Sequence, residues 1–205
     1  MEDRGRLDDV VEVHAAAFPR FFMTQLGPRF LREYYRCVIQ YPRGILLTED
    51  SGQGCDGFVS GFLDPAAFYR DLRNRRVRLA LAALGGVIVR PSRLLILRAN
   101  YGRVAGSAVQ AGEPRTAELS SIAVRPSVAG SGVGSRLVHR FIAAARAQGA
   151  ERVVLTTDAA DNAAVNHFYQ RLGFTCVRTF EARPGRMLNE YAIVTSRFER
   201  CETPS

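Results

Sequence analysis

The hydrophobic and polar positions divide the first third of the chain into two helical stretches and two strand-like stretches. Apolar side chains at helical spacing predict the helices, and short apolar runs bounded by polar residues predict the strands. We expect Asp8 or Asp9 to cap the first helix, since a short acidic side chain can accept from the first N–H groups. The predicted elements are the helices 8–17 and 28–40 and the strands 44–49 and 57–63.

A second helical stretch with many arginines follows these strands. Asp64-Pro65 is typical of a helix start, and leucine and phenylalanine alternate with arginine through residues 66–84. Residues 64–112 separate the strand 57–63 from the next predicted strand. We interpret them as a helical insertion that serves as a lid or an interface.

A glycine-rich loop marks the start of the most informative region. A buried strand runs through Val124, the chain turns at Pro126, and Gly130, Gly132 and Gly134 lead into a helix over 132–147. Glycine lets backbone approach a ligand closely, and the N–H groups at a helix N-terminus favour an anion. Residues 129–135 are therefore predicted to bind a phosphate or pyrophosphate group, with an unliganded turn as the alternative.

The loop does not match two other phosphate-binding signatures. A dinucleotide fingerprint needs G-x-G-x-x-G, whereas the spacing here is G-x-G-x-G. A nucleotide P-loop ends in Gly-Lys-Ser/Thr, and this chain contains no lysine.

The last third of the chain alternates strand and helix. Residues 152–157 form an apolar, β-branched run that we expect to lie parallel to the strand before the glycine loop. Asp161 or Asn162 is expected to cap a helix that ends at Gly173. A hairpin is predicted from 174–180 and 188–195, turning at Pro184-Gly185.

Length and composition indicate one globular domain over residues 1–205, with a frayed tail at 199–205. The four cysteines show no metal-like or CxxC spacing, which favours free thiols, and no metal site is implied. We expect a cytoplasmic protein, because the charged N-terminus does not resemble a signal peptide and no apolar run is long enough to span a membrane.

The net charge of +8 is concentrated in the insertion. Nine arginines and two aspartates lie between Asp64 and Arg103, a local net charge of +7. Such a surface can attract an anionic ligand, rest on an anionic membrane, or simply be solvated. Nucleic-acid binding is not favoured, since no helix-turn-helix or RNA-binding signature accompanies the charge.

Two motifs resemble those of the GNAT superfamily of acyl-CoA-dependent N-acetyltransferases. The family's V-x-P and Q/R-x-x-G-x-G/A motif matches Val124 to Pro126 followed by residues 129–134. Its N-x-x-A-x-x-x-Y-x-x-x-G-F motif matches 162–174, with Tyr169 at the tyrosine position. Ala129 departs from the usual Arg or Gln, and Val165 departs from a common Ala.

This resemblance implies an α/β fold with a mixed, mostly antiparallel sheet and helices on both faces. It implies acetyl-CoA as co-substrate, with the pantetheine arm on the strand and the pyrophosphate on the loop. Two N-terminal helices would help wall the acceptor pocket, with His14 and the aromatic residues Phe18, Phe21, Phe22, Tyr34 and Tyr35 either near the substrate or in the core. The implied cofactor-binding residues are Ile122, Ala123, Val124, Ala129, Gly130, Ser131, Gly132, Val133, Gly134, Ser135, Asn162 and Tyr169.

Two residues are candidates for proton transfer. The phenol of Tyr169 can protonate the departing thiolate, since its ordinary pKa of about 10 exceeds that of a thiol by little; packing in the core is the alternative. Glu118 lies four residues before Ile122, where some family members have the general base. The alternatives are an ordered water as the base and a structural salt bridge of Glu118 with an arginine. Ser120 shares a face with Glu118 under strict strand alternation, which a bulge would disturb.

The resulting interpretation is direct acetyl transfer from acetyl-CoA to a primary amine of a small molecule, such as an amino sugar, a polyamine or an amino acid. A protein N-terminal amine is the alternative acceptor. A non-catalytic acyl-CoA-binding module is the alternative class. A homodimer is left open.

Overall fold

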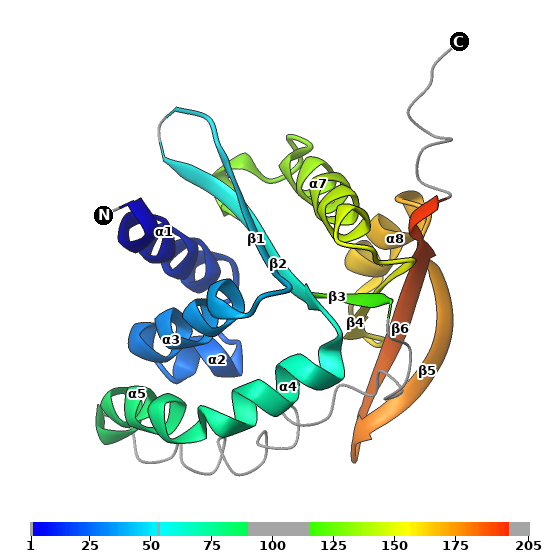
Figure 1. Ribbon diagram of the computed structural model, residues 1–205. Coiled ribbons are helices and arrows are strands. Elements are labelled where there is room, and N and C mark those ends of the chain that lie inside the picture. Colours follow the sequence, from blue (N-terminus) through cyan, green and yellow to red (C-terminus); the bar gives the residue numbers. More distant parts are fainter. Residues whose placement is uncertain (1, 53, 90–114, 197–205) are drawn as a thin grey trace.

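The computed structural model describes residues 2–52, 54–89 and 115–196. Six strands form one sheet in the order β1-β2-β3-β4-β6-β5 (Figure 1). Neighbours pair antiparallel, except that β3 and β4 are parallel. The strands are β1 (Gly44–Asp50), β2 (Cys55–Leu63), β3 (Thr116–Val124), β4 (Arg152–Asp158), β5 (Thr175–Arg183) and β6 (Arg186–Val194).

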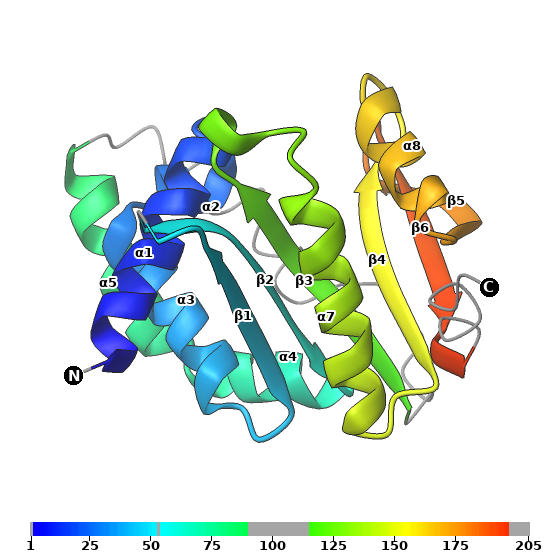
Figure 2. The ribbon, with the colours of Figure 1, turned by 90° about the horizontal axis from the view of Figure 1, so that it is seen from above.

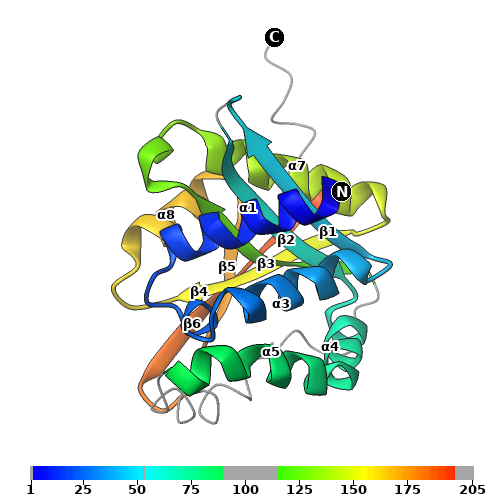
Figure 3. The same cartoon turned by 90° about the vertical axis from the view of Figure 1, so that its left-hand side faces the viewer.

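Helices cover both faces of the sheet, as the view in Figure 3 shows for α1, α3 and α5 in front and α7 and α8 behind. The expected α/β fold with a mixed, mostly antiparallel sheet is therefore confirmed. The helices are α1 (Glu2–Ala17), α2 (Phe22–Gln25), α3 (Pro28–Gln40), α4 (Pro65–Asn74), α5 (Arg76–Val89), α7 (Val133–Ala147) and α8 (Ala163–Arg171), with a 3-10 turn η1 (Pro126–Val128).

The sheet separates two hydrophobic layers. On one face, Phe58 and Phe62 of β2 pack with α1, α3 and α4. On the other, Val59 of β2 packs with Leu137 and Phe141 of α7. Alternate residues of β2 therefore serve the two layers, which is why this strand is buried almost throughout.

Two of the predicted helices differ from expectation. The first begins at Glu2, so Asp8 and Asp9 lie within it and the predicted cap is wrong. The stretch 66–84 is two helices, α4 and α5, which separate at Arg75. Asp64 does cap α4, as expected, by accepting from the N–H of Ala67 at 3.1 Å.

Within the predicted insertion, residues 65–74 and 76–89 are helical, and its status as an insertion stays a prediction. Its remainder, including the arginines at 90, 93, 98 and 103, lies outside the described residues, as do Cys201 and the tail expected at 199–205. Cys37, Cys55 and Cys176 are free thiols, as expected.

Candidate active site

The two central strands separate beyond a short paired segment. β3 pairs with β4 only from Thr116 to Glu118, opposite Arg152 to Val154, although both strands continue further. Figure 2 shows β3 and β4 side by side at one end and apart at the other. Beyond this segment, in what we call the opening between the strands, one backbone edge of β3 has no β4 partner in the strand register.

Backbone direction along β3 identifies which groups line that opening. The N–H of Arg125 donates to Asp56 O at 2.7 Å, so it points toward the β2 side. Ala123 O also lies on that side, 2.8 Å from where a Cβ on Gly57 would be. Because successive residues of a strand alternate in direction, the N–H and C=O groups of Ile122 and Val124 point to the other edge, toward the opening.

The glycine loop follows directly and is held in a left-handed conformation at two positions. Gly130 has φ of 84° and Gly132 has φ of 81°, values that favour glycine. The hydroxyl of Ser131 donates to Val128 O at 2.7 Å and ties the loop to η1. Residues 129–132 are exposed, as a loop that meets a ligand must be.

The N-terminus of α7 follows this loop directly, and its first N–H groups have no acceptor within the helix. The first helical hydrogen bond runs from Arg136 N to Gly132 O at 3.1 Å, so the N–H groups of Gly132 to Ser135 precede it. No acidic side chain occupies the first turn, and no side chain caps it. The positive end of the helix dipole is thus not offset by its own residues, which suits an anion.

Gly134 lies in the first turn of α7, and Asn162 directly precedes α8. A Cβ on Gly134 would lie 3.5 Å from the ring of Phe168, so the start of α7 and α8 are close neighbours. Asn162 occupies the position before α8, but its side chain makes no capping bond. It donates instead to Thr157 Oγ1 and, at 3.3 Å, to Asp158 O, so the capping role expected of Asn162 is wrong and its contact with cofactor stays a prediction.

Tyr169 is buried on the α7 face of the sheet. Its ring lies against Phe174, at 5.7 Å between centroids, and Tyr191, at 6.2 Å. Burial raises the pKa of the Tyr169 phenol above its ordinary value, so the hydroxyl keeps its proton at neutral pH. The hydroxyl therefore has a proton to give, but its raised pKa makes it a weaker acid toward a thiolate than the ordinary phenol that the sequence argument assumed.

A β-bulge determines which side chains of β3 face the N-terminal helices. Ser60 pairs with Ser121 and Gly61 with Leu119, which leaves Ser120 as the extra residue. A Cβ on Gly61 would lie only 2.0 Å from Glu118 O, so glycine is required opposite the bulge. The bulge keeps Glu118 and Ser120 on one face, as expected, and turns Ser121 to the same face.

Tyrosine hydroxyls from the helical layer meet each of these polar side chains. Tyr69 of α4 donates to Glu118 Oε1 at 2.7 Å, and Tyr34 of α3 is 2.8 Å from Ser120 Oγ. Burial raises the pKa of the Tyr35 phenol, and an interaction with Ser121 opposes that shift. The sequence analysis named Tyr34 and Tyr35 but missed Tyr69 and Ser121. The one available signal for Tyr69 was its position directly after the inward-facing Phe68.

His14 extends this network toward α1. Its Nδ1 lies 2.6 Å from the Tyr35 hydroxyl, and the ring is 1% exposed, so the core alternative holds for its packing. Burial lowers the pKa of His14 to about 4. Phe18 and Phe21 pack around the imidazole and remain partly exposed, so the aromatic residues form a wall from the surface to Tyr35.

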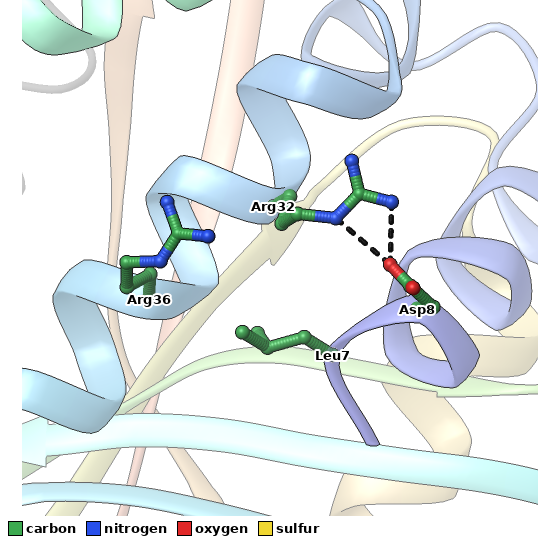
Figure 4. Close-up of a pocket in the computed structure, with 4 residues that line it drawn as sticks. All are labelled: Leu7, Asp8, Arg32 and Arg36. Atoms are coloured by element: carbon green, nitrogen blue, oxygen red, sulfur yellow. Dashed lines mark hydrogen bonds and ion pairs between the residues drawn. The ribbon is translucent and has the colours of Figure 1, made fainter. Parts of the chain in front are cut away.

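A cavity of about 270 Å³ lies elsewhere, between α1 and α3 (Figure 4). It is lined by Leu7, Asp8, Arg32 and Arg36. Arg32 donates to Asp8 from Nε at 2.8 Å, and Arg36 pairs with Glu33. These charges compensate one another, and none belongs to the predicted site, so we assign the chemistry to β3 instead.

Two further properties concern only the described part of the chain. No group of three or more His, Cys, Asp or Glu side chains there is arranged to hold a metal ion. None of the helices there is both long and apolar enough to cross a membrane.

Comparison with known proteins agrees with this arrangement. Proteins named as uncharacterized N-acetyltransferases in Mycobacterium tuberculosis and Mycobacterium bovis are 30% identical over 118 residues, 57% of this chain and 75% of theirs. The crystal structure of SsHAT matches with a TM-score of 0.61 at 24% identity, covering 95% of this chain and 94% of that one.

An aminoglycoside 6'-N-acetyltransferase in complex with coenzyme A has the same fold, with a TM-score of 0.57 at 13% identity over 92% of this chain and 90% of that one. Residues 7–174 match the acetyltransferase (GNAT) family, which spans both motifs and the divided strands. The chain therefore belongs to the GNAT family of N-acetyltransferases.

Proposed function

We propose that this acetyltransferase uses acetyl-CoA and transfers the acetyl group directly to a primary amine of a small molecule. The observation that carries this proposal is the opening between β3 and β4, where the backbone of Ile122 and Val124 has no β4 partner in the strand register. The pantetheine arm can pair with that edge as a strand would. The pyrophosphate then reaches the exposed glycine loop and the N-terminus of α7. The structure of a coenzyme A complex with this fold supports this choice of cofactor.

The reaction needs a polarised carbonyl, a neutral amine and a protonated leaving group. A backbone N–H at the opening polarises the thioester carbonyl, a contribution of about 3 kcal/mol for one well-placed donor. The amine nitrogen forms a bond to the carbonyl carbon, and Glu118 or an ordered water takes its proton. The C–S bond then breaks, and Tyr169 gives its proton to the departing thiolate.

The enclosure of Glu118 supports a small acceptor. Glu118 is only 7% exposed and accepts a hydrogen bond from Tyr69 of α4, so a small acceptor fits this position better than the surface of a folded polypeptide. The aromatic wall and the tyrosine hydroxyls provide both apolar and hydrogen-bonding contacts for a small molecule. An amino sugar, a polyamine and an amino acid are the acceptor classes we propose to test.

A thiol-release assay tests this function. Purified protein is mixed with acetyl-CoA and a panel of amino sugars, polyamines, amino acids and short peptides, and free coenzyme A is measured. We expect release with at least one small amine, and less release in Glu118→Gln at low pH, where deprotonation of the amine limits the rate. Release only with peptides would support the N-terminal alternative. Thioester binding without release from any amine would support a non-catalytic binding module.

A further inference from the structure

A hydrogen bond joins the arginine-rich insertion to the proposed base. The hydroxyl of Tyr69, in α4, donates to Glu118 Oε1 in β3 at 2.7 Å, and the two residues are 49 positions apart in the sequence. Both are buried, with exposures of 9% and 7%. A carboxylate can only accept, so the phenol is the donor, and a bond to an ionised group is stronger than one between neutral groups.

Packing fixes Tyr69 independently of this bond. Its ring lies 5.4 Å from Phe62 of β2, edge to face, and 5.5 Å from Phe68. Phe62 and Phe68 are themselves stacked at 3.7 Å. The hydroxyl is therefore directed at Glu118 before any substrate binds.

The start of α4 is also anchored to the strand that bears Glu118. The N–H of Asp64 donates to Thr116 O at 3.1 Å, and the Asp64 side chain caps the helix. Asp64 has φ of 52°, an unusual value for a residue other than glycine. The backbone strain at Asp64 is consistent with a connection that holds α4 in a fixed position relative to β3.

We propose that Tyr69 is a positioning residue for acetyl transfer, whose hydroxyl holds the Glu118 carboxylate in one orientation toward the acceptor. This inference rests on the proposed function, in which Glu118 takes the amine proton. It gives the helical insertion a part in the chemistry.

The hydrogen bond from Tyr69 should shift the pKa of Glu118 in a definite direction. Burial opposes the ionised form of a carboxyl, whereas a hydrogen bond donated to it favours that form. Within the described residues, the phenols of Tyr69 in α4 and Tyr34 in α3 face Glu118, and a phenol with its ordinary pKa of about 10 is uncharged at pH 7. The strands on either side present Phe62 of β2 and Val154 of β4 in register. Loss of the Tyr69 hydroxyl should therefore raise the pKa of Glu118.

The test compares Tyr69→Phe with a matched control, Tyr41→Phe. Tyr41 also packs on Phe68, at 5.3 Å between rings, but its hydroxyl donates weakly to Asp64 O at 3.5 Å. Titration of the Glu118 carboxyl carbon by NMR needs no acceptor. We expect its midpoint to rise by roughly one pH unit in Tyr69→Phe and to stay unchanged in Tyr41→Phe. An equal midpoint in wild type and Tyr69→Phe would overturn the proposal.

The same variants are then assayed with the acceptor found by thiol release. In Tyr69→Phe the acid limb of kcat/KM should move up by a similar amount, which lowers the rate about tenfold at acidic pH while the KM for acetyl-CoA is unchanged. In a Glu118→Gln background the same substitution should have no further effect on the rate. An active wild type whose Tyr69→Phe variant keeps the wild-type pH profile overturns the positioning role alone. A wild type that transfers to no amine overturns the proposed function as well.

Discussion

A glycine with left-handed backbone lies at each end of α7. Replacing each in turn by alanine distinguishes two effects: the backbone strain of the substitution and the loss of the proposed pyrophosphate site. Gly132 precedes the helix with φ of 81°, and Gly149 follows it with φ of 89°. An alanine Cβ would meet no atom within 4 Å at Gly149. At Gly132 it would meet only the flexible end of Arg136, at 3.2 Å. Gly132→Ala and Gly149→Ala therefore add the same group at matched backbone positions.

The expected magnitudes follow from that geometry. Placing alanine in the left-handed region costs about 1–2 kcal/mol, so both variants should lose that much free energy of unfolding. For a chain of 205 residues this corresponds to a fall in Tm of a few degrees, measured by thermal or urea unfolding. Only Gly132→Ala disturbs the loop that we propose holds the pyrophosphate. It should weaken acetyl-CoA binding about tenfold or more in calorimetry, whereas Gly149→Ala binds as wild type.

The reasoning is refuted if the two variants have the same affinity for acetyl-CoA. That result would mean that the loop conformation at Gly132 does not contribute to cofactor binding. Equal stability of wild type and Gly149→Ala would instead contradict the strain argument on which the magnitude depends.

Three further predictions concern single side chains. Tyr169→Phe should lower kcat about 100-fold, because it removes the proposed acid, while calorimetry finds acetyl-CoA affinity within twofold of wild type. The wild-type protein should lose stability as pH falls from about 6.5 to about 4, since the unfolded chain protonates His14 before the buried imidazole does. Urea unfolding of His14→Phe should show a pH dependence smaller by on the order of 3 kcal/mol, and an unchanged slope would rule out His14 as the source. Hydrogen bonds from Arg136 lower the pKa of Glu49, so that pair stabilises the fold above pH 4.5 and ceases to do so as pH falls through the lowered value. Glu49→Gln should cost up to about 1 kcal/mol at neutral pH and nothing near pH 2, and an equal cost at both would contradict this account.

Local signals in the sequence were sufficient for much of the fold. Short β-branched runs predicted the strands, and Gly149 and Gly173 marked the ends of α7 and α8, where both adopt positive φ. The start of α1 was wrong because Asp8 and Asp9 are good caps by composition, yet residues before them continue the helix. Glu2, Arg4, Arg6 and Leu7 favour a helix and extend it across Gly5, so capping propensity at Asp8 and Asp9 was a weak signal.

The cofactor side of the site was easier to predict than the acceptor side. The glycine loop and β3 use backbone groups at fixed spacing within one segment, which a motif captures. The acceptor side depends on contacts such as Tyr69 with Glu118 and Tyr34 with Ser120, which join residues far apart in sequence. The bulge at Ser120, which turns Ser121 toward the helices, depends on the register of β2 against β3 and has no clear local signature.

Residue-resolved amide hydrogen exchange, with and without acetyl-CoA, tests the central claim most directly, since that claim assigns cofactor binding to backbone groups. The account predicts new protection at Ile122 and Val124 and at Gly130 to Ser135, with little change along α4 and α5. Protection confined to the arginine-bearing helices, or no change at β3 and the glycine loop at saturating cofactor, would contradict it.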